Sequence, residues 1–179
     1  MKDDARRVKT RIRLREAMLD LLATGDFADI TAQRVVAHAG IGYATFFRHY
    51  AGVDALLVDL ADDLMTKLIA QALPALSGGN MREVISVVVR FVAAHRNAAT
   101  ALLVGGGDTV RHEITRRAND YTTRLPLPIE PQIPRELGVE FVVTGAITIL
   151  RWWLSVGQRY SAARVEALIA RLLVEPLAG

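Results

Sequence analysis

The stretch that most constrains the fold of this chain is residues 31–50, which predict two short helices joined by a tight turn. Thr31 is placed to cap the first helix, because a threonine side chain accepts a hydrogen bond from a free backbone N–H group. Gly40 follows the apolar stripe of that helix, and glycine reaches the left-handed conformation that ends a helix without steric cost. The second helix begins near Gly42 and carries Phe46 and Tyr50 on one face, where we expect both to be buried.

The other face of this second helix combines basic, aromatic and small side chains, which is typical of a helix that lies in the major groove of DNA. Arg48 and His49 are expected to contact phosphates or base edges, with ordinary solvated charge as the alternative interpretation. Thr45 is suited to a thymine methyl group or a phosphate. Tyr43 is suited to a sugar or a phosphate, and Ala44 marks a position of close approach.

The beginning of the chain is strongly basic, although the whole chain has a formal net charge of only +3. Basic amino-terminal arms commonly reach phosphates or a minor groove, and the alternative is a solvated helix start. The helix that precedes the recognition helix crosses the DNA backbone in this motif. The predicted DNA-binding residues are therefore Arg6, Lys9, Thr31, Arg34, Gly42, Tyr43, Ala44, Thr45, Phe47, Arg48 and His49.

Apolar periodicity predicts helices throughout the remaining chain, and no segment alternates with a period of two for long enough to predict a strand. We therefore predict an all-α protein of about nine helices, with a DNA-binding head over residues 1–51 and a larger domain over residues 52–179. The predicted helices span residues 4–24, 32–39, 42–50, 52–75, 81–95, 97–104, 108–124, 135–156 and 161–174.

Several local features refine this prediction. In the first helix, Val8, Ile12, Leu19 and Leu22 are expected to share the buried face, widened by Leu14, Met18 and Leu21. Further along the chain, Pro74 is expected to shorten or kink its helix, and Asp108 to cap the helix after the three glycines at 105–107. Phe27 and Ile30 are expected to anchor the connector of the head, Asn80 and Glu83 to form a reciprocal cap, and Pro126, Pro128, Pro131 and Pro134 to stiffen a loop.

Composition and motifs exclude several classes of protein. The chain has no cysteine, which excludes disulfides and thiolate metal sites. It carries no Gly-x-Ser-x-Gly, phosphate-loop or His-Glu-x-x-His motif, so we expect no enzymatic activity and no cofactor. No signal peptide is apparent, and we expect a cytoplasmic protein. Residues 137–154 are long enough to span a bilayer, but Glu140 and Arg151 would be costly there, so we predict a buried or interface helix and no membrane partner.

The larger domain is expected to bind a ligand and a second copy of the chain. Adjacent Trp152 and Trp153 point about 100° apart around a helix, so one is able to face a cavity and the other a partner subunit. The predicted ligand-binding residues are Met65, Phe91, His95, Leu103, His112 and Trp152, with satisfied structural histidines as the alternative. The predicted homodimer interface, a four-helix bundle, contains Val142, Gly145, Ile149, Trp153, Leu168 and Leu172, with a helix buried inside a larger core as the alternative.

The first sixty residues or so resemble the tetracycline-repressor (TetR) family of bacterial transcription regulators. The resemblance rests on Phe27, Thr31, Val35, Ala39, Gly40, Ile41, Thr45, Phe46, Phe47, Tyr50, Asp54, Leu56 and Leu57, in the family's order and spacing. It implies a homodimer whose two heads read a palindromic operator on double-stranded DNA. It also implies a carboxy-terminal helical domain that binds a small apolar or amphipathic effector and thereby changes the spacing of the heads, most simply in a repressor.

The chain departs from the family pattern at four positions, where Gly42 replaces a common Ser, Ala44 a common Gly, Phe47 a common Tyr and Val53 a common Lys. The last two changes remove phosphate contacts, so we expect a weaker grip on the backbone there, offset by the basic amino-terminal arm. Two alternatives stay open. One is a helical small-molecule-binding protein or enzyme that has lost DNA binding, and the other is an activator or ligand-independent regulator of the same fold.

Overall fold

The computed structural model describes residues 2–105, 107–123, 129–157 and 159–177. Within these residues it contains nine α-helices and no strand, which confirms the predicted all-α fold. The helices are α1 (Lys2–Thr24), α2 (Ala32–Ala39), α3 (Tyr43–His49), α4 (Val53–Ser77), α5 (Met81–Ala94), α6 (Arg96–Thr100), α7 (Gly107–Thr122), α8 (Arg135–Ser155) and α9 (Ala162–Ile169). Shorter 3-10 or π-helical segments are Phe27–Asp29, Ala101–Gly105, Ala170–Val174 and Glu175–Leu177.

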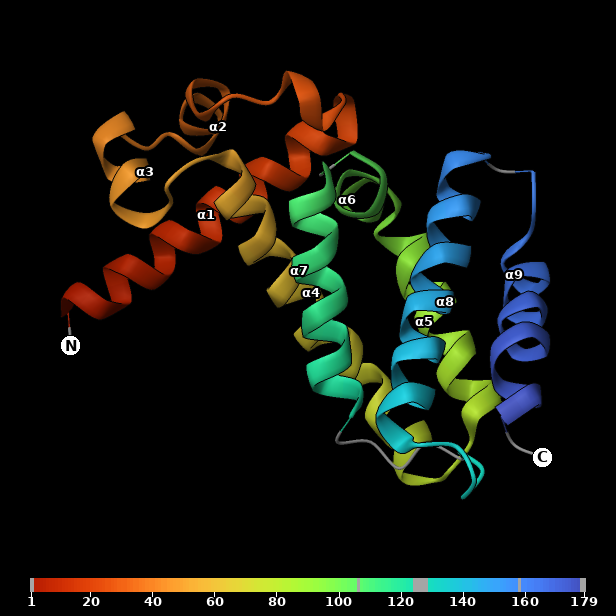
Figure 1. Cartoon of the computed structure of the whole chain (residues 1–179). Helices are drawn as coiled ribbons and strands as arrows, with labels where there is room; N and C mark the ends of the chain where they lie inside the picture. Colours follow the sequence, from red (N-terminus) through yellow and green to blue (C-terminus); the bar gives the residue numbers. More distant parts are fainter. Residues whose placement is uncertain (1, 106, 124–128, 158, 178–179) are drawn as a thin grey trace.

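Figure 1 shows a head built from α1, α2 and α3 at one end of the molecule and a body built from α4 to α9. Helix α4 runs from the head into the body, and α8 and α9 lie on the side of the body away from the head. The amino-terminal half of α1 extends past the rest of the head. The head therefore presents α3 and the start of α1 far from the α8–α9 side.

The buried face of α1 is not the predicted one at its beginning. Val8 and Ile12 are 53% and 47% exposed, because the part of α1 that carries them projects beyond α2 and α3 and is left uncovered by the described residues. Burial starts only at Leu14 and follows helical spacing from there. The side chains of α1 that reach the core are Leu14, Ala17, Met18, Leu21 and Leu22, with Leu19 partly buried against it.

Local signals in the sequence are confirmed at most turns. The Thr31 side chain accepts a hydrogen bond from the Arg34 N–H group at 3.3 Å, and Gly40 has a φ of 62° in the left-handed region. Asn80 accepts a hydrogen bond from the Glu83 N–H group at 3.2 Å. The reciprocal half of that predicted cap is absent, because the Glu83 carboxylate pairs with Arg90 at 2.7 Å.

Two helix ends differ from the prediction by one or two residues. Helix α4 continues through Pro74 to Ser77, since only the last turn follows the proline and few hydrogen bonds depend on it. Helix α7 begins at Gly107, so Asp108 lies inside its first turn rather than before it. The side chain of Asp108 lies outside the described residues, as do Gly106, Pro126 and Pro128.

The connector between α1 and α2 joins the head to the body. Ile30 is buried as predicted. Phe27 is half-buried and packs against the core, and a Cβ atom added to Gly105 would lie 3.6 Å from the Phe27 Cβ atom. The head therefore rests on the body through this contact with the segment Ala101–Gly105, through the packing of α1 on α6, and through the long helix α4.

Arg96 stabilises the carboxyl end of α8, although the sequence does not single it out. Helices α5 and α6 meet at a bend of 96°, and Arg96 begins α6 directly after that bend. Its guanidinium donates hydrogen bonds to the carbonyl oxygens of Trp153 at 3.3 Å and Gly157 at 2.9 Å, and lies 5.3 Å from the centre of the Trp153 ring. These carbonyls have no partner within the helix, so Arg96 acts as a side-chain cap from a neighbouring helix.

We expect the substitution Arg96→Met to lower the free energy of unfolding by about 1–3 kcal/mol, because it removes the charged donor and leaves carbonyl groups unpaired. Urea denaturation followed by circular dichroism measures the change. Arg90→Met is the matched control, since Arg90 is exposed on α5 and its one ion pair among the described residues is with Glu83, so it should change stability by less than about 0.5 kcal/mol. Equal effects of the two substitutions would contradict the assignment of Arg96 as a cap.

Candidate nucleic-acid interface

The orientation of α3 follows from the residues that it buries. Phe46 is completely buried and Tyr50 nearly so, as predicted. Because these two side chains point into the core, the opposite face of the helix turns outward. The residues exposed on that face are Tyr43, Ala44, Phe47 and Arg48, with Thr45 and His49 half-buried beside them.

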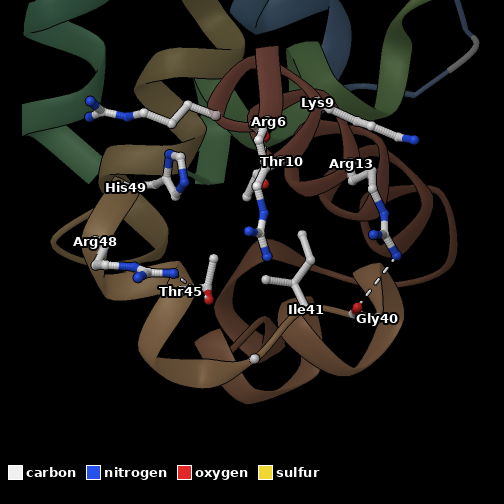
Figure 2. A pocket seen from close by; sticks show the side chains of 11 residues that line it. Arg6, Lys9, Thr10, Arg13, Gly40, Ile41, Thr45, Arg48 and His49 are labelled. Atoms are coloured by element: carbon white, nitrogen blue, oxygen red, sulfur yellow. Dashed lines mark hydrogen bonds between the residues drawn. The ribbon is translucent and has the colours of Figure 1, made fainter. Parts of the chain in front are cut away.

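A basic cleft of about 500 Å³ separates the start of α1 from the turn and helix that follow α2 (Figure 2). None of the lining residues that the structure describes is acidic. Among the described side chains, Arg6, Arg7 and Lys9 form no ion pair. The lining residues are Arg6, Arg7, Lys9, Thr10, Arg13, Gly40, Ile41, Gly42, Thr45, Arg48 and His49.

The structure brings six of the predicted DNA-binding residues into this cleft and leaves the others outside it. Those in the cleft are Arg6, Lys9, Gly42, Thr45, Arg48 and His49, whereas Tyr43, Ala44 and Phe47 lie on the exposed face of α3. Thr31 and Arg34 lie at the start of α2 and already have partners in the chain, since Arg34 also donates to the Asp29 carbonyl oxygen at 2.7 Å. Sequence reasoning missed Arg7, Thr10 and Arg13, although the spacing 6, 9, 10, 13 follows one helical face.

Arg13 ties α1 to the turn that precedes the recognition helix. Its guanidinium donates hydrogen bonds to the carbonyl oxygens of Ala39 at 2.6 Å and Gly40 at 3.4 Å (Figure 2). Ala39 is the last residue of α2, so its carbonyl has no partner within the helix. Arg13 therefore caps α2 and holds the left-handed Gly40 turn against the wall of the cleft.

The electrostatics of the cleft favour an anion. Arg48 donates a hydrogen bond to the Thr45 hydroxyl at 2.9 Å, which holds its guanidinium along α3. Burial lowers the pKa of His49 from its ordinary value, and the positive charges of Arg7, Arg48 and Arg11 lower it further. An anion bound among these cations would offset their positive charge and so raise the pKa of His49 again. The cleft thus holds like charges close together, and its described lining contains no acidic side chain.

Asp59 of α4 is the centre of a polar cluster that joins α1 and α3 to α4. It accepts hydrogen bonds from the Tyr50 hydroxyl at 2.6 Å and from Arg15 Nε at 2.7 Å, and it also pairs with Arg11. Arg15 extends the cluster to Asp63 at 2.9 Å. The carboxylates of this cluster lie on α4, whereas the two arginines lie on α1.

The pKa values of the cluster reflect its partners. Burial raises the pKa of Asp59, but the hydrogen bonds from Arg15, Tyr50 and Arg11 outweigh it and hold the pKa at about 2. Burial and the hydrogen bond to Asp59 raise the pKa of Tyr50 to about 12. At neutral pH the cluster therefore keeps an ionised aspartate and a protonated tyrosine.

Because the pKa of Asp59 in the folded chain lies below its ordinary value of 3.8, the stabilisation from this group is present above about pH 4 and is lost as the pH falls to about 2. We expect Asp59→Asn to lower the free energy of unfolding by about 2 kcal/mol at pH 7. The difference from the wild type should shrink between about pH 4 and pH 2. Urea denaturation across this range measures it, and a difference that is independent of pH would contradict the assignment.

The predicted ligand-binding residues do not all face the interior of the body. Phe91 and Leu103 are buried, and Met65 is half-buried. The His95 ring stacks on Phe91 with 4.2 Å between ring centres, and its Nδ1 atom lies 3.0 Å from the Phe91 carbonyl oxygen. His112 and Trp152 are exposed, because the faces of α7 and α8 that carry them turn away from the core.

An apolar face on α8 and the segment after α9 is left uncovered by the residues that the structure describes. A hollow of about 490 Å³ lies there, lined mainly by apolar side chains, with Glu140 as its one charged residue. Predicted interface residues Gly145, Ile149 and Leu172 line this hollow. The lining also includes Leu137, Phe141, Thr144, Thr148 and Leu173. The large apolar side chains most exposed on this side are Leu137, Phe141 and Leu172. Trp152 lies further along α8, where its ring packs against Tyr160.

The two adjacent tryptophans differ in burial, as their angular separation around α8 predicts. Trp153 is only 3% exposed, and its indole N–H donates a hydrogen bond to the Tyr160 carbonyl oxygen at 2.9 Å. Trp152 is the exposed member of the pair. Helical periodicity sets the angle between the directions of the two side chains, but the helices packed on α8 decide which ring is covered.

Other predicted interface residues are partly covered within the chain. Val142 and Leu168 are half-buried. A Cβ atom added to Gly145 would lie 2.5 Å from a methyl carbon of Leu173, so Gly145 packs within the chain.

Helix α8 has the length and composition of a membrane-spanning helix, and 33% of its most apolar window is buried inside the structure. Core helices of soluble proteins have the same properties. Helices α7 and α9 pack against α8 on its buried side.

No sequence model of a protein family matches the chain. Solved structures resemble it over nearly its whole length. A TetR transcriptional regulator from Streptococcus agalactiae is 21% identical with a TM-score of 0.70, and the match covers 98% of this chain and 99% of that chain. FadR from Thermus thermophilus, a TetR-family repressor in complex with lauroyl-CoA, is 18% identical with a TM-score of 0.72, covering 92% and 93%. The dihydroxyacetone kinase operon activator DhaS is 14% identical with a TM-score of 0.67, covering 95% and 97%. The chain therefore has the fold of TetR-family transcriptional regulators, as its resemblance implies.

Proposed function

We propose that this chain is a DNA-binding transcriptional regulator that acts as a homodimer, most simply as a repressor. The observation that carries the proposal is the exposed face of α3 beside a cleft of uncompensated positive charge. A short exposed helix after a left-handed glycine turn fits the major groove, and the adjacent cations fit the phosphates that border it. The shared fold supports the proposal but does not by itself establish a function.

The contacts divide between backbone and bases by their position on the head. Arg6, Arg7 and Lys9 on the free end of α1 are placed to bind phosphates, or a minor groove next to the recognition helix. Arg48 lies on α3 and reaches either base edges or a phosphate. At the start of α4, Gly52 offers no side-chain cap, so backbone N–H groups remain for a phosphate in place of the common lysine that Val53 replaces.

The exposed apolar face on α8 is proposed as the homodimer interface. A palindromic operator has two-fold symmetry, and a two-fold dimer places one head on each half-site. Helices α8 and α9 lie on the side of the body away from the head in Figure 1, so a second chain bound to α8 there leaves both heads free for DNA. Trp152, rather than Trp153, belongs to this interface.

The body is proposed to bind a small apolar or amphipathic effector that controls the heads. Helix α4 carries Asp59 in the polar cluster with α1. It then continues into the body, where its own residues Leu64 and Met65 are buried and half-buried. A ligand that shifts α4 would move the head with it and would change the balance between DNA-binding and free conformations. The lauroyl-CoA bound by the Thermus thermophilus neighbour is an amphipathic molecule, which makes long-chain acyl-CoA the first effector to test.

The proposed function is tested by selecting bound sequences from random duplex DNA with the full chain and then measuring the affinity at two salt concentrations. We expect a palindromic sequence whose affinity falls steeply with salt. Adding acyl-CoA should release the DNA if the effector assignment is right. A chain that enriches no sequence would contradict the proposal and favour the alternative, a helical small-molecule-binding protein or enzyme without DNA binding.

The double substitution Arg6→Ala and Arg7→Ala should reduce affinity about tenfold or more near physiological salt, because two phosphate contacts are lost in each subunit of the dimer. The slope of log affinity against log salt should fall by about 3.6 for the four contacts that the two subunits lose on duplex DNA. Arg82→Ala with Arg90→Ala is the matched control, since both arginines are exposed on α5 of the body. A change in affinity with an unchanged salt slope would show that the α1 arginines do not bind phosphates.

The dimer interface is tested by Phe141→Glu with Leu172→Glu, which places charges on the apolar face of both subunits. We expect the variant to be monomeric in analytical ultracentrifugation at concentrations where the wild type is dimeric, because burying these carboxylates would be costly. Val8→Glu is the control, since Val8 is an equally exposed apolar residue on α1. A variant that remains dimeric would place the interface elsewhere.

A further inference from the structure

The exposed face of α3 carries two large aromatic side chains that the other features of the head do not explain. Tyr43 and Phe47 are 56% and 47% exposed, and their ring centres lie 4.9 Å apart. Phe47 also meets the buried Phe46 edge-on, with 5.2 Å between ring centres. The outer pair is therefore supported from beneath and held in one place on the surface.

The two rings lie away from the phosphate-binding charges. At about 100° per residue, Tyr43 and Phe47 occupy one side of the exposed arc of α3, whereas Thr45 and His49 occupy the side that lines the basic cleft. Ala44 lies between the two sides, and its small side chain lets the helix approach the floor of the groove. A second hollow, of about 590 Å³ between α2 and α3, borders Tyr43 on the side away from Arg48.

The chemistry of Phe47 narrows what it is able to recognise. A phenyl ring has no group that hydrogen-bonds a phosphate oxygen or a polar base edge, and leaving it exposed to water is unfavourable. Burial of the ring against an apolar group of the DNA would remove this unfavourable exposure and so stabilise the complex. In the major groove, the base edges present one apolar group, the C5-methyl group of thymine.

We propose that the Tyr43–Phe47 ring pair recognises the C5-methyl group of a thymine in each half-site of the operator. The inference rests on the proposed DNA-binding function and adds a specificity determinant to it. Phe47 provides the contact surface, and Tyr43 packs against it and extends that surface toward the amino end of α3. The pair thus reads one base pair through an apolar contact, while the cleft holds the backbone by charge.

The test replaces each thymine of the selected operator by deoxyuridine, one position at a time, in otherwise identical duplexes. Deoxyuridine pairs like thymine and lacks only the C5-methyl group. We expect one position in each half-site at which affinity falls about fourfold, and about fifteenfold when both half-sites are changed, from the loss of one buried methyl group per head. At the same position, a cytosine should bind more weakly than a 5-methylcytosine.

A variant assigns the effect to the ring pair. In Phe47→Ala, replacing that thymine by deoxyuridine should change affinity by less than about 1.5-fold, because the contact has already been removed. Phe47→Leu keeps an apolar side chain and is the matched control, so it should retain part of the effect. Both substitutions are at an exposed position, and circular dichroism melting checks that each variant folds.

The possible outcomes separate this inference from the proposed function. A chain that selects an operator but tolerates deoxyuridine at every position would overturn the methyl contact and leave DNA binding intact. A deoxyuridine effect that is unchanged in Phe47→Ala would assign the contact to another residue and also overturn the inference. A chain that selects no duplex at all would overturn both.

Discussion

The burial of Phe46 is the constraint on which the rest of the candidate interface depends. Its ring is fully enclosed by the core that α1, α2 and α4 share, and enclosing a side chain of this size contributes about 1.5–3 kcal/mol. Because Phe46 points inward, the residues two before and two after it, Ala44 and Arg48, lie about 160° away around α3 and point outward. The single apolar anchor thereby decides which side chains a DNA molecule would meet.

The charges of the chain are divided between a compensated cluster and an uncompensated one. At the joint between head and body, Asp59 and Asp63 neutralise Arg11 and Arg15, so the joint is held by paired groups that are partly screened from water. At the cleft, Arg6, Arg7 and Lys9 have no acidic partner among the described residues. A net charge of only +3 therefore conceals a locally strong positive potential, which is the property that attracts DNA phosphates.

The same fold serves repressors and an activator among the solved structures that this chain resembles. The conclusion about function consequently depends on the site rather than on the fold. The head combines the exposed face of α3, which is suited to base edges, with the basic cleft, which is suited to the DNA backbone. Helix α4 links both to the body. Such an arrangement lets a change in the body alter the position of the head without changing any group that touches DNA.

The sequence by itself determined the features that depend on neighbouring residues. These include the nine helices, the Thr31 cap, the left-handed Gly40 turn, the Asn80 cap and the inward face of α3, because each follows from local hydrogen bonding, backbone conformation or helical periodicity. The residues of the basic arm were likewise visible as a local excess of charge.

Only the tertiary structure decided which apolar and charged groups are covered. It leaves Val8, Ile12 and Trp152 exposed, buries Trp153, turns His112 outward, and draws Arg13 onto the end of α2 and Arg96 onto the end of α8. Periodicity shows that a helix has an apolar face, but another helix must pack on that face to bury it. Where the covering group lies far away along the chain, or in a second copy of it, the sequence of the helix alone does not contain the answer.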